Sequence, residues 1–147
     1  MAGVRWRTIE HTADLGLEVE APSLADLFVA SAHGMAGVLV GSEEGGVPGP
    51  VSAEASAWRD FDLEAPDTEA LLVEWLRELL HIQMSDGKLV AAAEIDELDD
   101  GRLVARVGLG EPGEGTEVER ELKGVTYHDL TVEQRDDGWF ARVVFDL

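Results

Sequence analysis

The chain ends on the stretch Trp139-Phe140-Ala141-Arg142-Val143-Val144-Phe145-Asp146-Leu147, an apolar strand pattern that runs to the last residue. Chain ends are usually polar and poorly ordered, so this pattern predicts a strand held within a sheet. The turn Asp136-Asp137-Gly138 precedes it, and alternating residues from Leu130 to Arg135 precede the turn. A glycine that follows Asp can supply the positive φ of a tight turn, which predicts a hairpin of two antiparallel strands.

A second carboxylate, Asp14, lies near the other end of the chain in the turn His11-Thr12-Ala13-Asp14, and a strand pattern follows it. If the last strand pairs with that strand, the side chains of Asp14 and Asp146 converge with the α-carboxylate of Leu147. Three hard oxygen donors favour Ca²⁺ or Mg²⁺ over zinc. Each acid alone also has an ordinary interpretation, because Asp is common in turns and a strand-end acid can simply be solvated.

Two amphipathic helices are predicted between these ends. The first opens at Pro22-Ser23, where Ser23 can cap it. Its apolar residues recur at helical spacing: Leu24, Leu27, Phe28, Met35, Val38 and Leu39. Asp67 is the expected cap of the second helix. That helix has a broad apolar stripe, which consists of Leu71, Leu72, Trp75, Leu76, Leu79 and Leu80.

The other segments with strand patterns are residues 5–10, 15–20, 55–64, 88–98, 102–109 and 117–125. Asp99-Asp100-Gly101 predicts a hairpin between the segments 88–98 and 102–109. Residues 41–50 and 108–115 are rich in loop-forming residues. We therefore expect an α+β fold, a largely antiparallel β-sheet with two helices packed on one face, in a single domain over residues 1–147.

The amino-acid composition limits the classes of function that the protein can have. The chain has 31 acidic and 11 basic residues, a net charge of −20, which opposes direct binding to DNA or RNA. The acidity is also compatible with a solubility trait or a saline cytoplasm. There is no cysteine, hence no thiolate metal site or cysteine nucleophile. No secretory leader or membrane span is predicted, so we expect a cytoplasmic protein without membrane partners.

Catalytic signatures are missing from the sequence. It contains no Gly-x-Ser-x-Gly, phosphate-loop, dinucleotide or His-Glu-x-x-His motif. The segment Lys123-Gly124-Val125-Thr126-Tyr127-His128 gathers an ammonium, a hydroxyl, a phenol and an imidazole. It could form a catalytic patch or a partner-binding edge, and Tyr127 could instead be half buried in the core. His11 and His128 could approach each other if their loops share one end of the sheet.

Several of these segments together resemble the archease family, in the family's order and over essentially the whole chain. They are residues 11–17 (His-Thr-Ala-Asp-Leu-Gly-Leu), 71–80 in the second helix, Gly110-Glu111, 123–128 (Lys-Gly-Val-Thr-Tyr-His) and the ending 139–147. The His-Thr-Ala-Asp start, the Thr-Tyr-His segment and the Asp-aliphatic end are specific in combination. Residues 41–56 match poorly.

The resemblance implies a non-enzymatic activator of the RtcB-type RNA ligase, which joins tRNA halves and other broken RNAs. Such a protein promotes guanylylation of the ligase and its multiple turnover, and meets RNA only through the ligase. The resemblance also implies a calcium site built from Asp14, Asp146 and Leu147, with Leu147 binding through a main-chain or terminal oxygen. Lys123 and His128, with His11, are candidates for contact with the partner.

Two other function classes remain open at this stage. A chaperone-like interaction module would use an exposed apolar patch and would not depend on a metal. A small metal-dependent hydrolase would turn over phosphate esters without a partner, although the sequence lacks a nucleophile or base constellation for it. A passive structural domain is the outcome if Asp14 and Asp146 lie far apart.

Overall fold

The computed structural model describes residues 3–10, 14–49, 55–112 and 117–147. Within these residues the chain forms eight strands and two helices. In chain order they are β1 (Arg5–Glu10), β2 (Asp14–Ala21), α1 (Leu24–Leu39), β3 (Glu44–Gly45), β4 (Ala57–Glu64), α2 (Thr68–Asp86), β5 (Leu89–Leu98), β6 (Arg102–Gly110), β7 (Gly124–Arg135) and β8 (Gly138–Asp146).

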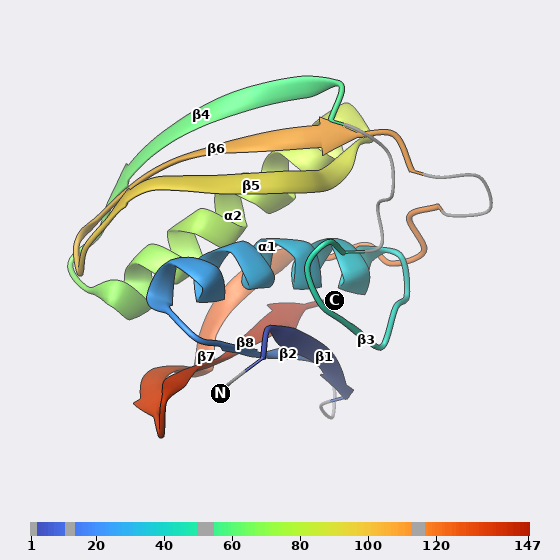
Figure 1. Ribbon diagram of the computed structural model, residues 1–147. Coiled ribbons are helices and arrows are strands. Elements are labelled where there is room, and N and C mark those ends of the chain that lie inside the picture. The colour runs from blue at the N-terminus through green and yellow to red at the C-terminus, as the bar shows by residue number, and fades with distance from the viewer. Residues whose placement is uncertain (1–2, 11–13, 50–54, 113–116) are drawn as a thin grey trace.

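The molecule has three layers, with both helices between two sheets (Figure 1). One sheet has five strands in the order β3-β1-β2-β8-β7, and the other has three in the order β4-β6-β5. All the pairings are antiparallel. The predicted α+β class and the two helices are confirmed. The strands, however, divide between two sheets, so the helices are covered on both sides.

Both helices begin at the predicted caps. The Ser23 hydroxyl accepts a hydrogen bond from the Asp26 amide at 3.1 Å, and the Asp67 carboxylate accepts one from the Ala70 amide at 2.8 Å. Each bond satisfies an amide that has no partner inside the helix. Gly87 ends α2 in the left-handed conformation, with φ of 68°. The starts of both helices and the end of α2 are therefore fixed by local sequence.

The core connects all three layers. Trp75 of α2 is fully buried, and its indole N–H donates to the carbonyl oxygen of Phe28 in α1 at 2.9 Å. Phe61 of β4 packs edge-on against the Trp75 ring, with 5.7 Å between the ring centroids. On the other side, Leu17 of β2 and Phe145 of β8 are fully buried against the same cluster. Apolar burial across both helix faces supplies most of the driving force for folding.

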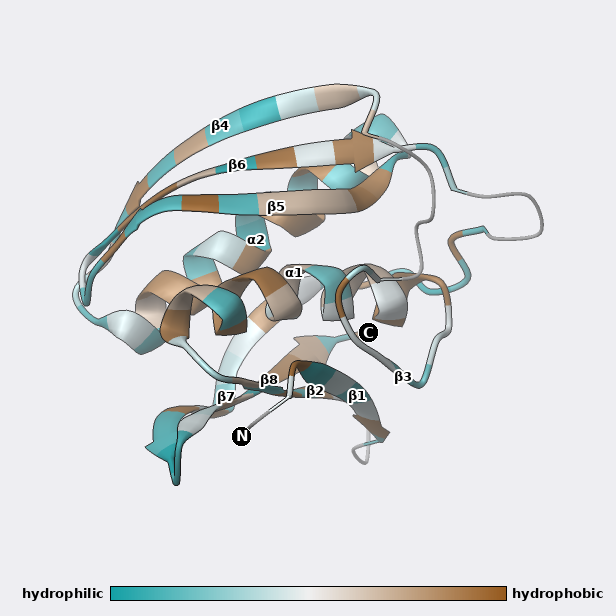
Figure 2. Ribbon diagram, viewed as in Figure 1, coloured by the Kyte–Doolittle hydropathy of each residue, from teal (hydrophilic) through white to brown (hydrophobic). Residues whose placement is uncertain are grey.

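Both predicted hairpins form, but the turn geometry differs from the expectation. In the β7–β8 hairpin Asp136, and not Gly138, has the positive φ, 48°. In the β5–β6 hairpin the Asp99 carboxylate accepts hydrogen bonds from the amides of Gly101 and Arg102. The tip of the β7–β8 hairpin is hydrophilic (Figure 2).

The predicted strand over residues 117–125 is wrong for most of its length. The amides of Glu119 and Arg120 donate to the carbonyl oxygen of Leu39, at the end of α1. This segment therefore caps a helix end, and strand pairing starts only at Gly124. Among the described residues no helix is long and apolar enough to cross a membrane.

Candidate functional site

The first residue of β2 lies directly opposite the last residue of β8. Asp14 pairs with Asp146, and the register continues through Leu15 with Phe145 and Gly16 with Val144. Side chains of directly opposed residues on antiparallel strands are about 5 Å apart at Cβ. The two carboxylates expected from the sequence to converge are therefore neighbours.

The two acids share the face of the sheet that points away from the helices. Their neighbours Leu15 and Phe145 are buried on the helix side, and side chains alternate along a strand. On the other side of β8, Gly124 pairs with Asp146 and so belongs to the same face. A Cβ atom added at Gly124 would have no heavy atom within 4 Å. The carboxylate of Asp146 thus borders open space.

Within the described ranges, the two acids at this end of the sheet lack an ion-pair partner. Among the described residues, no Lys, Arg or His forms an ion pair with Asp14 or Asp146. Like charges directly opposite each other on two strands are destabilising. A bound cation would remove that repulsion, so the donor set fits a hard divalent ion.

Side chains alone do not complete a metal centre here. Within the described ranges no three His, Cys, Asp or Glu side chains are grouped so that they could hold an ion. Leu147 follows Asp146 directly and is 46% exposed, so its main-chain oxygens are accessible next to Asp146 in the chain. A cation would need those oxygens, water or a partner's groups in addition to the two carboxylates.

The structure describes two of the three predicted partner-binding residues, Lys123 and His128. His11 lies outside the described residues, and so does its expected approach to His128. Lys123 is exposed, and its amide donates to the carbonyl oxygen of Asp146 at 2.9 Å. The structure therefore brings Lys123 to the same end of the sheet as the two acids.

His128 lies farther along β7, where the strand leaves the ladder. The register between β7 and β8 breaks after Thr126 and resumes at Thr131, and Asp129 has a positive φ of 51°. Thr126 shapes this bulge, because its hydroxyl donates to Val144 and accepts from the His128 amide. Tyr127 is consequently 52% exposed, so the alternative that placed it half in the core is wrong.

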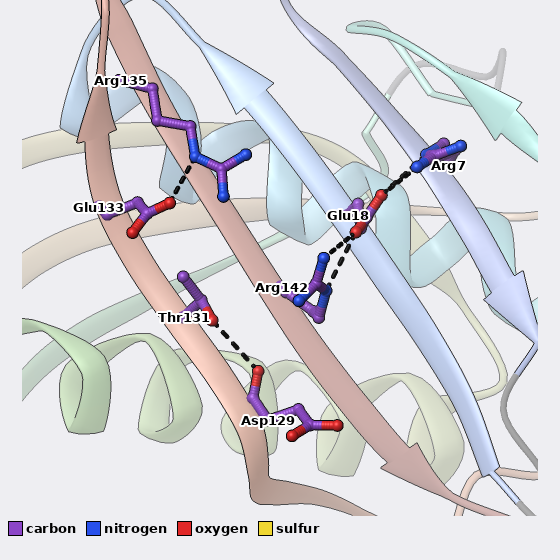
Figure 3. Close-up of polar contacts among 7 residues, drawn as sticks. All are labelled: Arg7, Glu18, Asp129, Thr131, Glu133, Arg135 and Arg142. Carbon is purple, nitrogen blue, oxygen red and sulfur yellow. Dashed lines mark hydrogen bonds and ion pairs between the residues drawn. The ribbon is translucent and has the colours of Figure 1, made fainter.

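A charged cluster on the outer face of the five-stranded sheet was missed by the sequence reasoning. Glu18 of β2 accepts hydrogen bonds from Arg7 of β1 at 2.9 Å and from Arg142 of β8 at 3.0 Å (Figure 3). Burial disfavours the charged form of Glu18, but the bonds from Arg142 and Arg7 outweigh it and hold its pKa below the usual value. The signal in the sequence that could have revealed this cluster is Glu18, an acidic residue in the middle of an apolar strand pattern.

Comparison with known proteins then places the chain. Residues 6–147 match the model of the archease protein family (MTH1598/TM1083). The chain belongs to the archease family.

Curated archeases match it over nearly their whole length. The protein archease of Methanosarcina acetivorans is 33% identical over 99% of this chain and 97% of its own. That of Pyrococcus abyssi is 32% identical over 97% of this chain and 99% of its own.

Solved structures agree on the fold. The solution structure of Methanobacterium thermoautotrophicum protein 1598 has a TM-score of 0.66 at 28% identity, over 97% of this chain and 98% of that one. A crystal structure from Thermotoga maritima, described as an archease and possible chaperone, has a TM-score of 0.59 at 21% identity. It covers 95% of this chain and 94% of that one, and it supports the fold alone.

Proposed function

We propose that this archease is a non-enzymatic activator of an RtcB-type RNA ligase in tRNA splicing and RNA repair. It promotes guanylylation of the ligase and its multiple turnover in the cytoplasm. Membership of the archease family supports the partner, and the opposed carboxylates of Asp14 and Asp146 support a working site at this end of the sheet. The chain itself supplies no catalytic residue in this proposal.

The proposed site holds Ca²⁺ or another hard divalent cation. Asp14 and Asp146 would bind it through their carboxylates, and Leu147 through a main-chain oxygen. The ion would supply a positive charge that the ligase can recognise or that neutralises the acidic end on docking. The observation that carries this assignment is the direct pairing of the two acids without a described basic partner.

Docking would be steered by charge. With a net charge of −20 the protein is attracted to the basic surface that a ligase needs for RNA and nucleotide, and opposite potentials accelerate encounter. The proposed contacts with the ligase, near the end of the sheet that carries Asp14 and Asp146, are Lys123, His128 and His11. RNA is met only through the ligase, because the chain lacks a basic stripe.

Multiple-turnover RNA ligation by the cognate ligase tests the activator role. We expect ligation that stops after one turnover without this protein and continues when a substoichiometric amount is added. Ligation that is equally fast with and without it would reject the role.

Calorimetric titration with Ca²⁺ tests the site separately. Wild type should bind one ion, and Asp146→Asn should bind it at least about tenfold more weakly. A short C-terminal extension should also weaken binding if Leu147 is a ligand. Affinities unchanged in both proteins would reject the metal site and leave the activator role intact.

A chaperone-like interaction module is the second candidate, favoured by the description of the Thermotoga maritima structure as a possible chaperone. It would suppress aggregation of unrelated proteins at equal efficiency with and without a chelator. Suppression without any effect on ligation would favour this function.

A further inference from the structure

An open groove of about 780 Å³ lies between the second half of α2 and the start of β7. It adjoins the end of the sheet that carries Asp14 and Asp146. Residues of α2 that line it include Arg77, His81 and Met84, and those of the other wall include Lys123 and Tyr127. Asp146 also borders it. The groove is thus continuous with the end of the sheet where the proposed cation binds.

The groove has an apolar floor and exposed apolar walls. Leu80, Leu122 and Val125 are almost completely buried beneath it. Met84 is 41% exposed and Tyr127 52% exposed. These are two of the six large hydrophobic side chains that are exposed in the described part of the chain, and Leu147, beside Asp146, is a third. Exposed apolar side chains that line one groove, as Met84 and Tyr127 do, are typical of a contact site.

The charge of the groove is opposite to that of the molecule. Lys123 and His81 line it, and within the described ranges neither has a carboxylate within ion-pair distance. Asp146 is the acid among the lining residues. In a chain with 31 acidic residues, a lysine that forms no ion pair within the described ranges stands out. The groove can therefore attract an anionic group that the rest of the surface repels.

Arg77 gives the groove a fixed wall. Its guanidinium donates to the carbonyl oxygen of Val125 at 3.2 and 3.1 Å and to Glu74 at 3.3 Å. It also lies over the Tyr127 ring, 5.2 Å from the centroid. Because Arg77 already donates to the edge carbonyl of Val125, it competes with an added strand at this point. The groove therefore favours an occupant that binds through its side chains.

We propose that the groove docks a segment of the RNA ligase in which an apolar side chain stands beside an Asp or Glu. The apolar side chain would pack between Met84 and Tyr127, and the carboxylate would bind Lys123. One unengaged ammonium and one imidazole are too few to hold an RNA backbone, because that binding depends on several cationic contacts to phosphates. This inference rests on the proposed function, since it names the surface through which the activator holds its ligase.

Binding of the labelled cognate ligase tests the groove. Lys123→Glu and Met84→Ser are the groove variants, and Arg5→Glu and Trp58→Ser are matched controls on other surfaces, with side chains that are likewise exposed. We expect each groove variant to raise the Kd about tenfold, and to raise equally the protein concentration for half-maximal ligation. The controls should stay within about twofold. Circular dichroism verifies that every variant is folded.

The other outcomes separate the two proposals. If wild type binds and activates the ligase and the groove variants do so equally well, the groove proposal fails and the activator role stands. If wild type neither binds nor activates the ligase, both fail. If the isolated protein binds a single-stranded RNA and Lys123→Glu abolishes that binding but not binding to the ligase, the groove is an RNA site and the proposal is overturned.

Discussion

His33 is a buried residue that the fold holds without charge. Its side chain is 2% exposed within α1, and its Nδ1 accepts a hydrogen bond from the Gly49 amide at 3.2 Å. Burial lowers the pKa of His33 from 6.5 to about 4. Protonation would both charge a buried ring and remove the acceptor, which would release the segment around Gly49 from α1.

Stability should therefore fall with pH in a defined window. The folded-state pKa lies below the unfolded value, so this contribution is complete above pH 6.5 and is lost as the pH falls from 6.5 towards 4. Linkage gives a loss of about 2 kcal/mol between pH 7 and pH 5. Urea unfolding of wild type and His33→Gln at both pH values checks it. An equal pH dependence in the two proteins would contradict the assignment.

Substitution by alanine should affect stability differently at two glycines, Gly37 of α1 and Gly124 of β7. A Cβ at Gly37 of α1 would overlap the indole of Trp6, whereas one at Gly124 would meet no atom within 4 Å. Gly37→Ala should cost about 2 kcal/mol, because overpacking outweighs the gain in helix propensity. Gly124→Ala should change stability by less than about 0.5 kcal/mol. Thermal unfolding of both variants decides the matter, and similar losses would refute it.

At the scale of elements, the helices were predictable and parts of the strands were not. Caps at Ser23 and Asp67 and the apolar spacing in each helix are local signals, so the sequence contains them. The segment before Gly124 alternates like a strand, yet its amides bind Leu39 at the end of α1. That partner is about eighty positions away in the sequence, and alternation alone does not identify it.

The side chain of Glu18 connects three neighbouring strands, β1, β2 and β8, through ion pairs. Its side chain is 9% exposed, and it holds Arg7 on one side and Arg142 on the other. Glu18→Gln should cost about 2 kcal/mol, because two neighbouring guanidinium groups lose their shared counter-charge. Since the pKa of Glu18 is lowered, its contribution is present above the ordinary Glu value and is lost as the pH falls through the folded one.

The exposed pair Glu133–Arg135, on β7 of the same sheet, provides the control (Figure 3). Surface ion pairs contribute little, so Glu133→Gln should leave the urea midpoint nearly unchanged. Equal shifts for Glu18→Gln and Glu133→Gln would show that Glu18 has no special role.

At the scale of the whole molecule, part of the site followed from the sequence. The convergence of Asp14 and Asp146 needed only that the strand after Asp14 pairs with the last strand, and it does. The division of the strands into two sheets was not predictable, because alternation shows that a strand has a buried face but not which strands are its neighbours. The groove was missed for the same reason, since α2 and β7 meet only through tertiary contacts, such as the hydrogen bond from Arg77 to the carbonyl oxygen of Val125.

We propose that the paired acids at the end of the sheet are the working part of an RNA ligase activator. Multiple-turnover ligation with wild type, Asp14→Asn and Asp60→Asn tests it most directly, since Asp60 is an exposed acid on the outer three-stranded sheet. We predict sustained ligation with wild type and Asp60→Asn, and ligation reduced at least about tenfold with Asp14→Asn. Sustained ligation with Asp14→Asn at the wild-type rate would contradict the account.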